Sequence, residues 1–199
     1  FSNQPLPKGP NLAIVTNSGG PGILAADATE TSGLMLARLG QGTVEKLMEF
    51  LPPYASLYNP IDIIGDAPAS RYRQTLEGVL KDERANAVMV LLSPTASVQV
   101  EDTAQAMFDL SKTSNKPIFG CFMGEMVVSK GKKMLGQAGI PCYSFPEPAI
   151  YAIDAMFKYH ERKGRPAPVE VCYRRNREAA AQVIQTARRQ GLDEIVEFQ

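Results

Sequence analysis

The fold is decided by the stretch Leu12-Ala13-Ile14-Val15-Thr16, which runs directly into Asn17-Ser18-Gly19-Gly20-Pro21-Gly22 and then into Ile23-Leu24-Ala25-Ala26-Asp27-Ala28. The first run is short, apolar and β-branched, which is typical of a strand buried on both faces. The glycines allow the backbone to turn tightly, and the small residues after them favour a helix. The stretch therefore predicts a strand, a glycine-rich loop and a helix in direct succession.

The same alternation continues along the chain. Further apolar runs predict strands at 87–92, 117–122 and 141–143, and 58–65 is another short, turn-bounded apolar segment. Apolar residues at helical spacing predict helices at 43–51, 70–80, 104–111, 126–138 and from Pro146 onward. Strands without polar alternation, separated by helices, are typical of a parallel sheet covered on both faces. We therefore predict an α/β fold, a doubly wound, mostly parallel sheet in a flavodoxin-like three-layer arrangement.

Three segments are expected along the 199 residues. Residues 1–10 hold three prolines and no periodicity, and are predicted to be a linker. Residues 11–163 form the flavodoxin-like domain. Residues 164–199 begin with a proline-containing linker and carry an amphipathic helix over Arg174 to Gln190. Because the chain begins with Phe1 and not with methionine, we expect it to be a fragment or a processed chain.

Composition excludes several classes of function. Lys plus Arg and Asp plus Glu each number 21, so the formal net charge is zero. This balance provides no electrostatic footprint for nucleic acid or for an anionic membrane, and no apolar run is long enough to span a bilayer. Three scattered cysteines, Cys121, Cys142 and Cys172, fit a reducing, cytoplasmic setting. No metal site is expected, because the single His160 cannot form a zinc cluster with them.

The glycine-rich loop is the candidate binding site. Its candidate phosphate ligands are Asn17, Ser18, Gly19, Gly20, Gly22 and Ile23. If the helix begins at Pro21, the neighbouring amides have no helical partner and lie at the positive end of the helix dipole, beside the Ser18 hydroxyl. This arrangement predicts an anion site, and phosphate suits it. A plain strand-to-helix turn is the alternative. No lysine follows the loop, so an amide-only site would release its anion easily.

Other polar residues carry weaker signals. Asn59 and Asp62 lie in a turn-forming segment at the sheet edge, where they could support a loop or face a ligand. Cys121 has no base near it in sequence, and we interpret it as a packed thiol. His160 lies at a polar helix end, and we interpret it as a solvated or capping residue.

Three segments, taken in order, resemble one protein family. They are 13–22, then Asn59-Pro60-Ile61-Asp62, then Gly139-Ile140-Pro141-Cys142-Tyr143 with Pro146-Glu147-Pro148-Ala149. Together they are similar to the C-terminal ligase domain of the ADP-forming (NDP-forming) acetyl-CoA or acyl-CoA synthetases, which are kin of succinyl-CoA synthetase. The resemblance covers about Pro10 to Tyr159.

The resemblance implies an acid–thiol ligase. The family interconverts acyl-CoA, ADP and phosphate with acid, CoA and ATP through an acyl phosphate and a phosphohistidine. Helix N-termini of two flavodoxin-like domains cradle the phosphohistidine phosphate, and the helix at Pro21 resembles one of them. The implied partners are CoA-binding and phosphohistidine-bearing domains and an ATP-grasp domain or subunit. On this reading the chain binds phosphate but no cofactor directly, and CoA, ADP or ATP and Mg belong to the full enzyme.

The sequence also departs from the family. The phosphorylated histidine lies in a Ser-His-Thr-Gly-like segment that has no match here, and His160 does not stand in its place. The catalytic residue is therefore unknown, and we expect no ligase activity from the isolated chain. Arg174 to Phe198 resembles the linker into the ATP-grasp domain. Two alternatives remain: a flavodoxin-like nucleotide or flavin module, and a non-catalytic ligase-like regulatory region of a protein lysine acetyltransferase.

Overall fold

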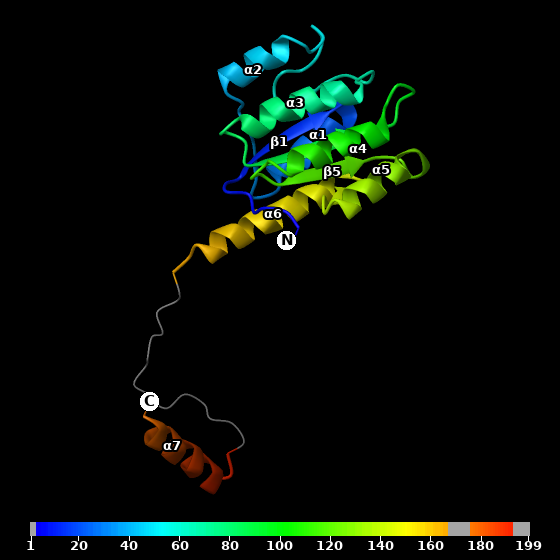
Figure 1. The fold of residues 1–199 in the computed structure, drawn as a ribbon. Coiled ribbons are helices and arrows are strands. Elements are labelled where there is room, and N and C mark those ends of the chain that lie inside the picture. The colour runs from blue at the N-terminus through cyan, green and yellow to red at the C-terminus, as the bar shows by residue number, and fades with distance from the viewer. Residues whose placement is uncertain (1–2, 167–175, 193–199) are drawn as a thin grey trace. The chain divides into compact units, whose positions relative to one another are not determined.

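The computed structural model describes residues 3–166 and 176–192 (Figure 1). The strands are β1 (Asn11–Thr16), β2 (Met35–Leu36), β3 (Ile61–Asp62), β4 (Ala87–Leu92), β5 (Ile118–Phe122) and β6 (Cys142–Tyr143). The helices are α1 (Gly19–Glu30), α2 (Gln41–Met48), α3 (Ala69–Lys81), α4 (Val100–Ser111), α5 (Glu125–Gln137), α6 (Pro146–Lys163) and α7 (Arg177–Arg189). Residues 1–165 and 166–199 form two compact units, and each is described by itself.

The first unit is built on a parallel sheet of six strands. Its order is β2-β1-β4-β5-β6, and β3 also pairs with β1. The central pair runs in register from Leu12 opposite Ala87 to Thr16 opposite Leu91. Every described pairing is parallel. The predicted doubly wound α/β architecture is therefore confirmed.

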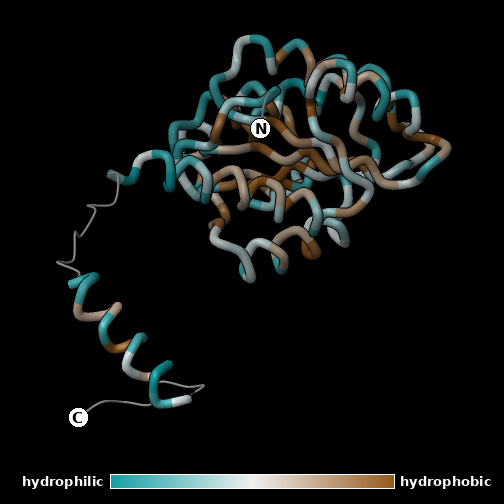
Figure 2. Tube along the Cα trace, turned by 90° about the horizontal axis from the view of Figure 1, so that it is seen from below, coloured by the Kyte–Doolittle hydropathy of each residue, from teal (hydrophilic) through white to brown (hydrophobic). Residues whose placement is uncertain are grey.

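Alternate residues of the central strands are buried on opposite faces. Ala13 and Val15 pack with α2, α3, α4 and α5, whereas Leu12 and Ile14 pack with α1 and α6. Helices thus cover both sides of the sheet in three layers (Figure 1). Figure 2 shows the apolar strands running through the interior, with hydrophilic segments of chain outside them. Burial on both faces explains why these strands are continuous apolar runs in the sequence.

The edge beside β1 is shared by two short strands. β2 pairs with the start of β1 and β3 with its end. Between them the Asn59 side chain replaces a strand: its Oδ1 accepts from the Ile14 N–H at 2.8 Å, and its Nδ2 donates to the carbonyls of Leu12 at 2.7 Å and Ala37 at 3.2 Å. Asn59 therefore supports the edge from within, and its amide is fully occupied by these bonds.

Residues 1–10 were predicted to be a linker, and the described part of this segment, 3–10, contacts the domain. The Gln4 side chain accepts from the Ile118 N–H at 3.0 Å and donates to the Gly139 carbonyl at 3.1 Å. Pro7 is buried, and Leu6 packs on the cluster beneath α1 and α6. Proline content correctly indicated an irregular backbone, but it does not report side-chain contacts with distant strands.

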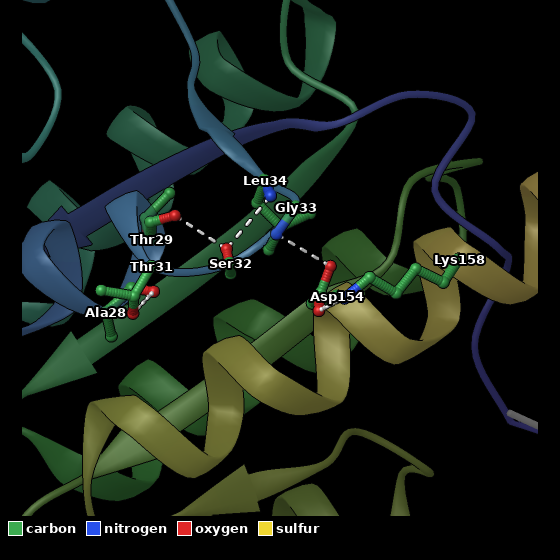
Figure 3. Close-up of polar contacts among 8 residues, drawn as sticks. All are labelled: Ala28, Thr29, Thr31, Ser32, Gly33, Leu34, Asp154 and Lys158. Carbon is green, nitrogen blue, oxygen red and sulfur yellow. Dashed lines mark hydrogen bonds and ion pairs between the residues drawn. The ribbon is translucent and has the colours of Figure 1, made fainter.

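A polar contact joins the turn after α1 to α6 (Figure 3). The Gly33 N–H donates to Asp154 Oδ1 at 3.1 Å, and the Lys158 ammonium pairs with Asp154 Oδ2 at 2.5 Å. Asp154 is only 7% exposed, so both carboxylate oxygens need these partners. The contact holds the α1–β2 turn in place.

The described part of the second unit is α7 and its flanks. The Asn176 side chain accepts from the Ala179 N–H at 3.0 Å, which caps the first turn. At the other end, Gly191 has a φ of +69° and the Leu192 N–H donates to the Ala187 carbonyl at 3.0 Å, as in a Schellman motif. Residues 174 and 175 of the predicted helix lie outside the described residues.

Candidate functional site at the start of helix α1

The glycine-rich loop lies where the sheet changes winding direction. The chain leaves β1 into α1 on one face of the sheet, whereas it leaves β4 into α4 on the other. Ligands of open α/β sheets bind outside the carboxyl ends of the strands at such a switch point. The end of β1 and the first turn of α1 are therefore the natural candidate site.

Helix α1 begins at Gly19, two residues before the predicted start at Pro21. The Gly22 N–H already donates to the Ser18 carbonyl at 3.3 Å, and Ile23 follows within the helix. These two predicted donors are therefore not free, which corrects the expectation. The amides of Gly19 and Gly20 precede the first helical bond, and both residues are exposed. Pro21, between them and Gly22, has no amide hydrogen.

Thr16 shapes the loop between strand and helix. Its Oγ1 accepts from the Ser18 N–H at 3.0 Å and donates to the Ser18 carbonyl at 2.8 Å. This closed pair of bonds fixes the turn and consumes the backbone amide of Ser18. The Ser18 side chain makes no capping hydrogen bond, so the helix does not use its hydroxyl. Thr16 was not among the predicted site residues, although a threonine that ends a buried strand is a signal for such a turn.

Asn17 belongs to the framework of the site. The residue is 2% exposed, and its side chain joins the ends of β1 and β4. Nδ2 donates to the Ser93 carbonyl at 2.9 Å, and Oδ1 accepts from the Ser93 N–H at 2.8 Å. These bonds continue the β1–β4 pairing past Thr16 and Leu91. Asn17 therefore positions the loop, and its amide is not a free phosphate ligand.

Asp62 lies next to the first turn of α1. A β-carbon built on Gly19 would be 3.6 Å from Asp62 Oδ2. The other oxygen, Oδ1, accepts from the Ile64 N–H at 2.9 Å. Ile64 has a φ of +73°, a left-handed conformation that is unfavourable for a β-branched residue. The backbone after β3 thus holds a carboxylate beside Gly19.

The negative charge of Asp62 also affects the pKa of a buried tyrosine. Burial, and then the charge of Asp62, raise the pKa of Tyr72, whose hydroxyl donates to the Leu91 carbonyl at 3.1 Å. The tyrosine is therefore neutral and serves as a hydrogen-bond donor. The same carboxylate opposes any anion that enters the site, because like charges a few ångströms apart repel.

The other sequence candidates lie elsewhere or are inert. Burial raises the pKa of the Cys121 thiol to about 12, so it is not a thiolate nucleophile near neutral pH. His160 is in the last turn of α6. Within residues 3–166 and 176–192, no group of three or more potential metal ligands converges. Among the same residues, no helix is both long enough and apolar enough to cross a membrane. Cys172 lies outside the described residues.

Two amides, one hydroxyl and the positive end of a twelve-residue helix can hold a small anion. No described lysine or arginine contributes a hydrogen bond or ion pair to this loop. The Asp62 carboxylate lowers the affinity further. The chemistry available is brief, reversible stabilisation of a phosphoryl-sized anion.

Comparison with known proteins points to one family. The Ligase-CoA domain matches residues 12–165. The chain is 40% identical over 152 residues to ADP-forming acetate–CoA ligase I of Archaeoglobus fulgidus, a match that covers 76% of this chain and 21% of that protein. It is 38% identical over 165 residues to the alpha subunit of ADP-forming acetate–CoA ligase II of Pyrococcus furiosus, covering 81% of this chain and 36% of the subunit.

The fold is shared with a solved acetyl-CoA synthetase. Dinucleotide-forming acetyl-coenzyme A synthetase 1 of Ca. Korarchaeum cryptofilum, in complex with phosphate and ADP, superposes with a TM-score of 0.72 at 29% identity. The match covers 83% of this chain and 38% of that one. In each of these comparisons the chain spans less than two fifths of its relative.

Proposed function

The chain belongs to the Ligase-CoA domain family, and from this premise we propose that it is the ligase domain of an ADP-forming acyl-CoA synthetase. The full enzyme would interconvert acyl-CoA, ADP and phosphate with acid, CoA and ATP. The domain would present the start of α1 to the phosphate of a phosphohistidine that another domain delivers. The free amides of Gly19 and Gly20 at the switch point of the sheet carry this proposal.

The geometry suits a transferred group better than a stored one. Backbone amides stabilise a phosphoryl group without a mobile countercharge, because their dipoles are already oriented. The nearby Asp62 carboxylate limits how tightly the group is held. A site with these opposing contributions releases its anion readily, as a reversible phosphoryl relay requires.

The remaining chemistry would come from other parts of the enzyme. We propose that the phosphorylated histidine, the CoA site, and the ATP-grasp site for ADP or ATP and Mg lie in partner domains or subunits. The names of the relatives support this division, since one is an alpha subunit and another is bound to phosphate and ADP. The flavin-module and acetyltransferase-regulator alternatives predict the same fold, so the architecture does not separate them, and no described contact favours either one.

A pair of variants at one position tests the proposal. Apart from its chain neighbours, a β-carbon at Gly20 meets no atom within 4 Å. Gly20→Ala therefore keeps the amide, whereas Gly20→Pro removes it. Titration of the 199-residue chain with inorganic phosphate, followed by amide NMR, should shift the Gly19 and Gly20 signals in a saturable way. Gly20→Pro should weaken binding roughly tenfold, whereas Gly20→Ala should bind normally. Equal binding by both variants, or no saturable shift at Gly19, would overturn the site.

A further inference from the structure

The backbone that carries Asp62 is fixed beside the start of α1. β3 pairs with the end of β1, with Asp62 opposite Thr16, and the Ile63 N–H donates to the Thr16 carbonyl at 2.8 Å. Pro60 packs against the first turn of α1, since a β-carbon built on Gly22 would lie 3.5 Å from Pro60 Cβ. The strand pairing and this contact together set the position of the carboxylate relative to the helix.

Only one of the two Asp62 carboxylate oxygens is used within the domain. Oδ1 accepts from the Ile64 N–H at 2.9 Å, which orients the side chain. Oδ2 lies 3.6 Å from a β-carbon built on Gly19, and among residues 3–166 and 176–192 it has no hydrogen-bond or ion-pair partner. An ionised carboxylate can only accept hydrogen bonds. The site therefore presents the amide donors of Gly19 and Gly20 and, next to them, one unused acceptor.

We propose that Asp62 makes this site selective for phosphate that carries a hydroxyl, against fully ionised anions of the same shape. This inference rests on the proposed phosphate site. Hydrogen phosphate bears one P–OH group, which can donate to Oδ2 while other oxygens accept from the amides of Gly19 and Gly20. Hydrogen bonds between a hydroxyl and an ionised oxygen are among the strong ones. Sulfate has no hydrogen to donate, so its oxygens meet the carboxylate only as like charges.

The selectivity arises from a repulsive contact. Every anion that enters the site meets the negative charge of Asp62, but only an anion with a hydroxyl offsets part of that repulsion with a hydrogen bond. Binding sites achieve specificity in this way, by leaving the wrong ligand with an unpaired or like-charged contact. A fully ionised phosphoryl group that is joined to another atom also lacks the hydroxyl. Asp62 therefore favours free phosphate over such a group, which suits a site that releases its phosphoryl group.

Three anions of equal charge test the proposal in the 199-residue chain. At about pH 8, hydrogen phosphate, sulfate and monofluorophosphate are predominantly dianions, and only the first carries a hydroxyl. Amide NMR titrations at constant ionic strength should show saturable shifts of Gly19 and Gly20. We expect phosphate to bind roughly ten- to a hundredfold more tightly than either of the other anions. Equal affinities for phosphate and sulfate would overturn the selectivity. Monofluorophosphate binding as tightly as phosphate would overturn the role of the hydroxyl.

Two variants test the assignment to Asp62. Asp62→Asn keeps an oxygen for the Ile64 N–H and replaces the free Oδ2 by an amide nitrogen that donates hydrogen bonds. Sulfate should then gain more affinity than phosphate does, so that the preference for phosphate falls below about threefold. Asp27→Asn removes a charge at an exposed position in a later turn of α1 and should keep the preference of the parent chain. An unchanged preference in Asp62→Asn would show that another group selects the anion.

Failure of this inference and failure of the proposed function give different results. If the parent chain binds phosphate saturably at Gly19 but binds sulfate equally well, the phosphate site stands and the selectivity is refuted. If no anion shifts Gly19 saturably, the phosphate site itself is absent and both proposals are refuted. The ranking of the three anions by the parent chain needs no variant, so it decides the matter even if Asp62→Asn does not fold.

Discussion

The Asn17 side chain makes two hydrogen bonds to the backbone of Ser93, so that a single amide joins the ends of β1 and β4. The two residues are 76 positions apart in sequence. The bonds hold together the pair of strands at which the sheet changes winding direction.

Removal of this junction should destabilise the fold. Asn17→Ala leaves the N–H and C=O of Ser93 without these partners at a site that is 2% exposed. We expect the free energy of unfolding to fall by about 2–4 kcal/mol. Urea denaturation at neutral pH measures this loss. Asn115→Ala, an exposed asparagine without such bonds, should change stability by less than about 0.5 kcal/mol. Equal effects of the two variants would contradict the structural role of Asn17.

Neutralisation of Asp62 should strengthen phosphate binding. Asp62→Asn can keep the Oδ1 contact with the Ile64 N–H while removing the negative charge beside Gly19. We expect a roughly three- to tenfold gain in phosphate affinity at low ionic strength, which shrinks as salt screens the charge. Calorimetric titration at two salt concentrations measures both effects.

Asp27→Asn is the matched control for this variant. This variant also removes one negative charge, but Asp27 is exposed and lies in a later turn of α1. We expect little change in phosphate affinity from it. Weaker phosphate binding by Asp62→Asn would show that the carboxylate supports the site instead of opposing the anion.

The turn before β2 should not tolerate a side chain at Gly33. A β-carbon there would lie 2.8 Å from Asp154 Oδ1, the atom that accepts the Gly33 N–H (Figure 3). Gly33→Ala should therefore cost about 1–3 kcal/mol of stability. Gly42→Ala provides the contrast, because its β-carbon meets no atom within 4 Å and lies in α2, where alanine is the better helix former. Thermal unfolding should show a lower Tm for the first variant and an unchanged or higher Tm for the second.

The chain on its own should not synthesise ATP. Acetyl-CoA, ADP, Mg and phosphate, incubated with the 199 residues, should give no ATP above the enzyme-free background, because the single histidine of the sequence, His160, lies in the last turn of α6 and not at the loop. A coupled luminescence assay measures the product. A complete ADP-forming acetate–CoA ligase, run in parallel, shows that the assay works. Turnover by this chain alone would refute the proposed division of labour among domains.

Sequence patterns predicted the elements whose residues are all buried to a similar degree. The apolar runs 12–15 of β1 and 87–92 of β4 are buried on both faces, so each strand can be recognised from its own sequence. The two-residue strand β2 carries no such pattern, and it forms because its backbone meets that of Asn11 and Leu12. The start of α1 was placed too late because proline fits several positions of a first turn, so Pro21 does not specify which one it occupies.

The sequence by itself determined the alternation of strands and helices and the glycine-rich turn, because periodicity and backbone freedom are properties of neighbouring residues. Only the tertiary structure decided which groups of that turn remain free. The Asn17 side-chain amide is hydrogen-bonded to Ser93, and that of Asn59 is hydrogen-bonded to the backbone of β1. The position of β3 brings the Asp62 carboxylate close to Gly19. Whether the side-chain amides of Asn17 and Asn59 are free depends on atoms that lie far away along the chain, and folding alone brings those atoms together.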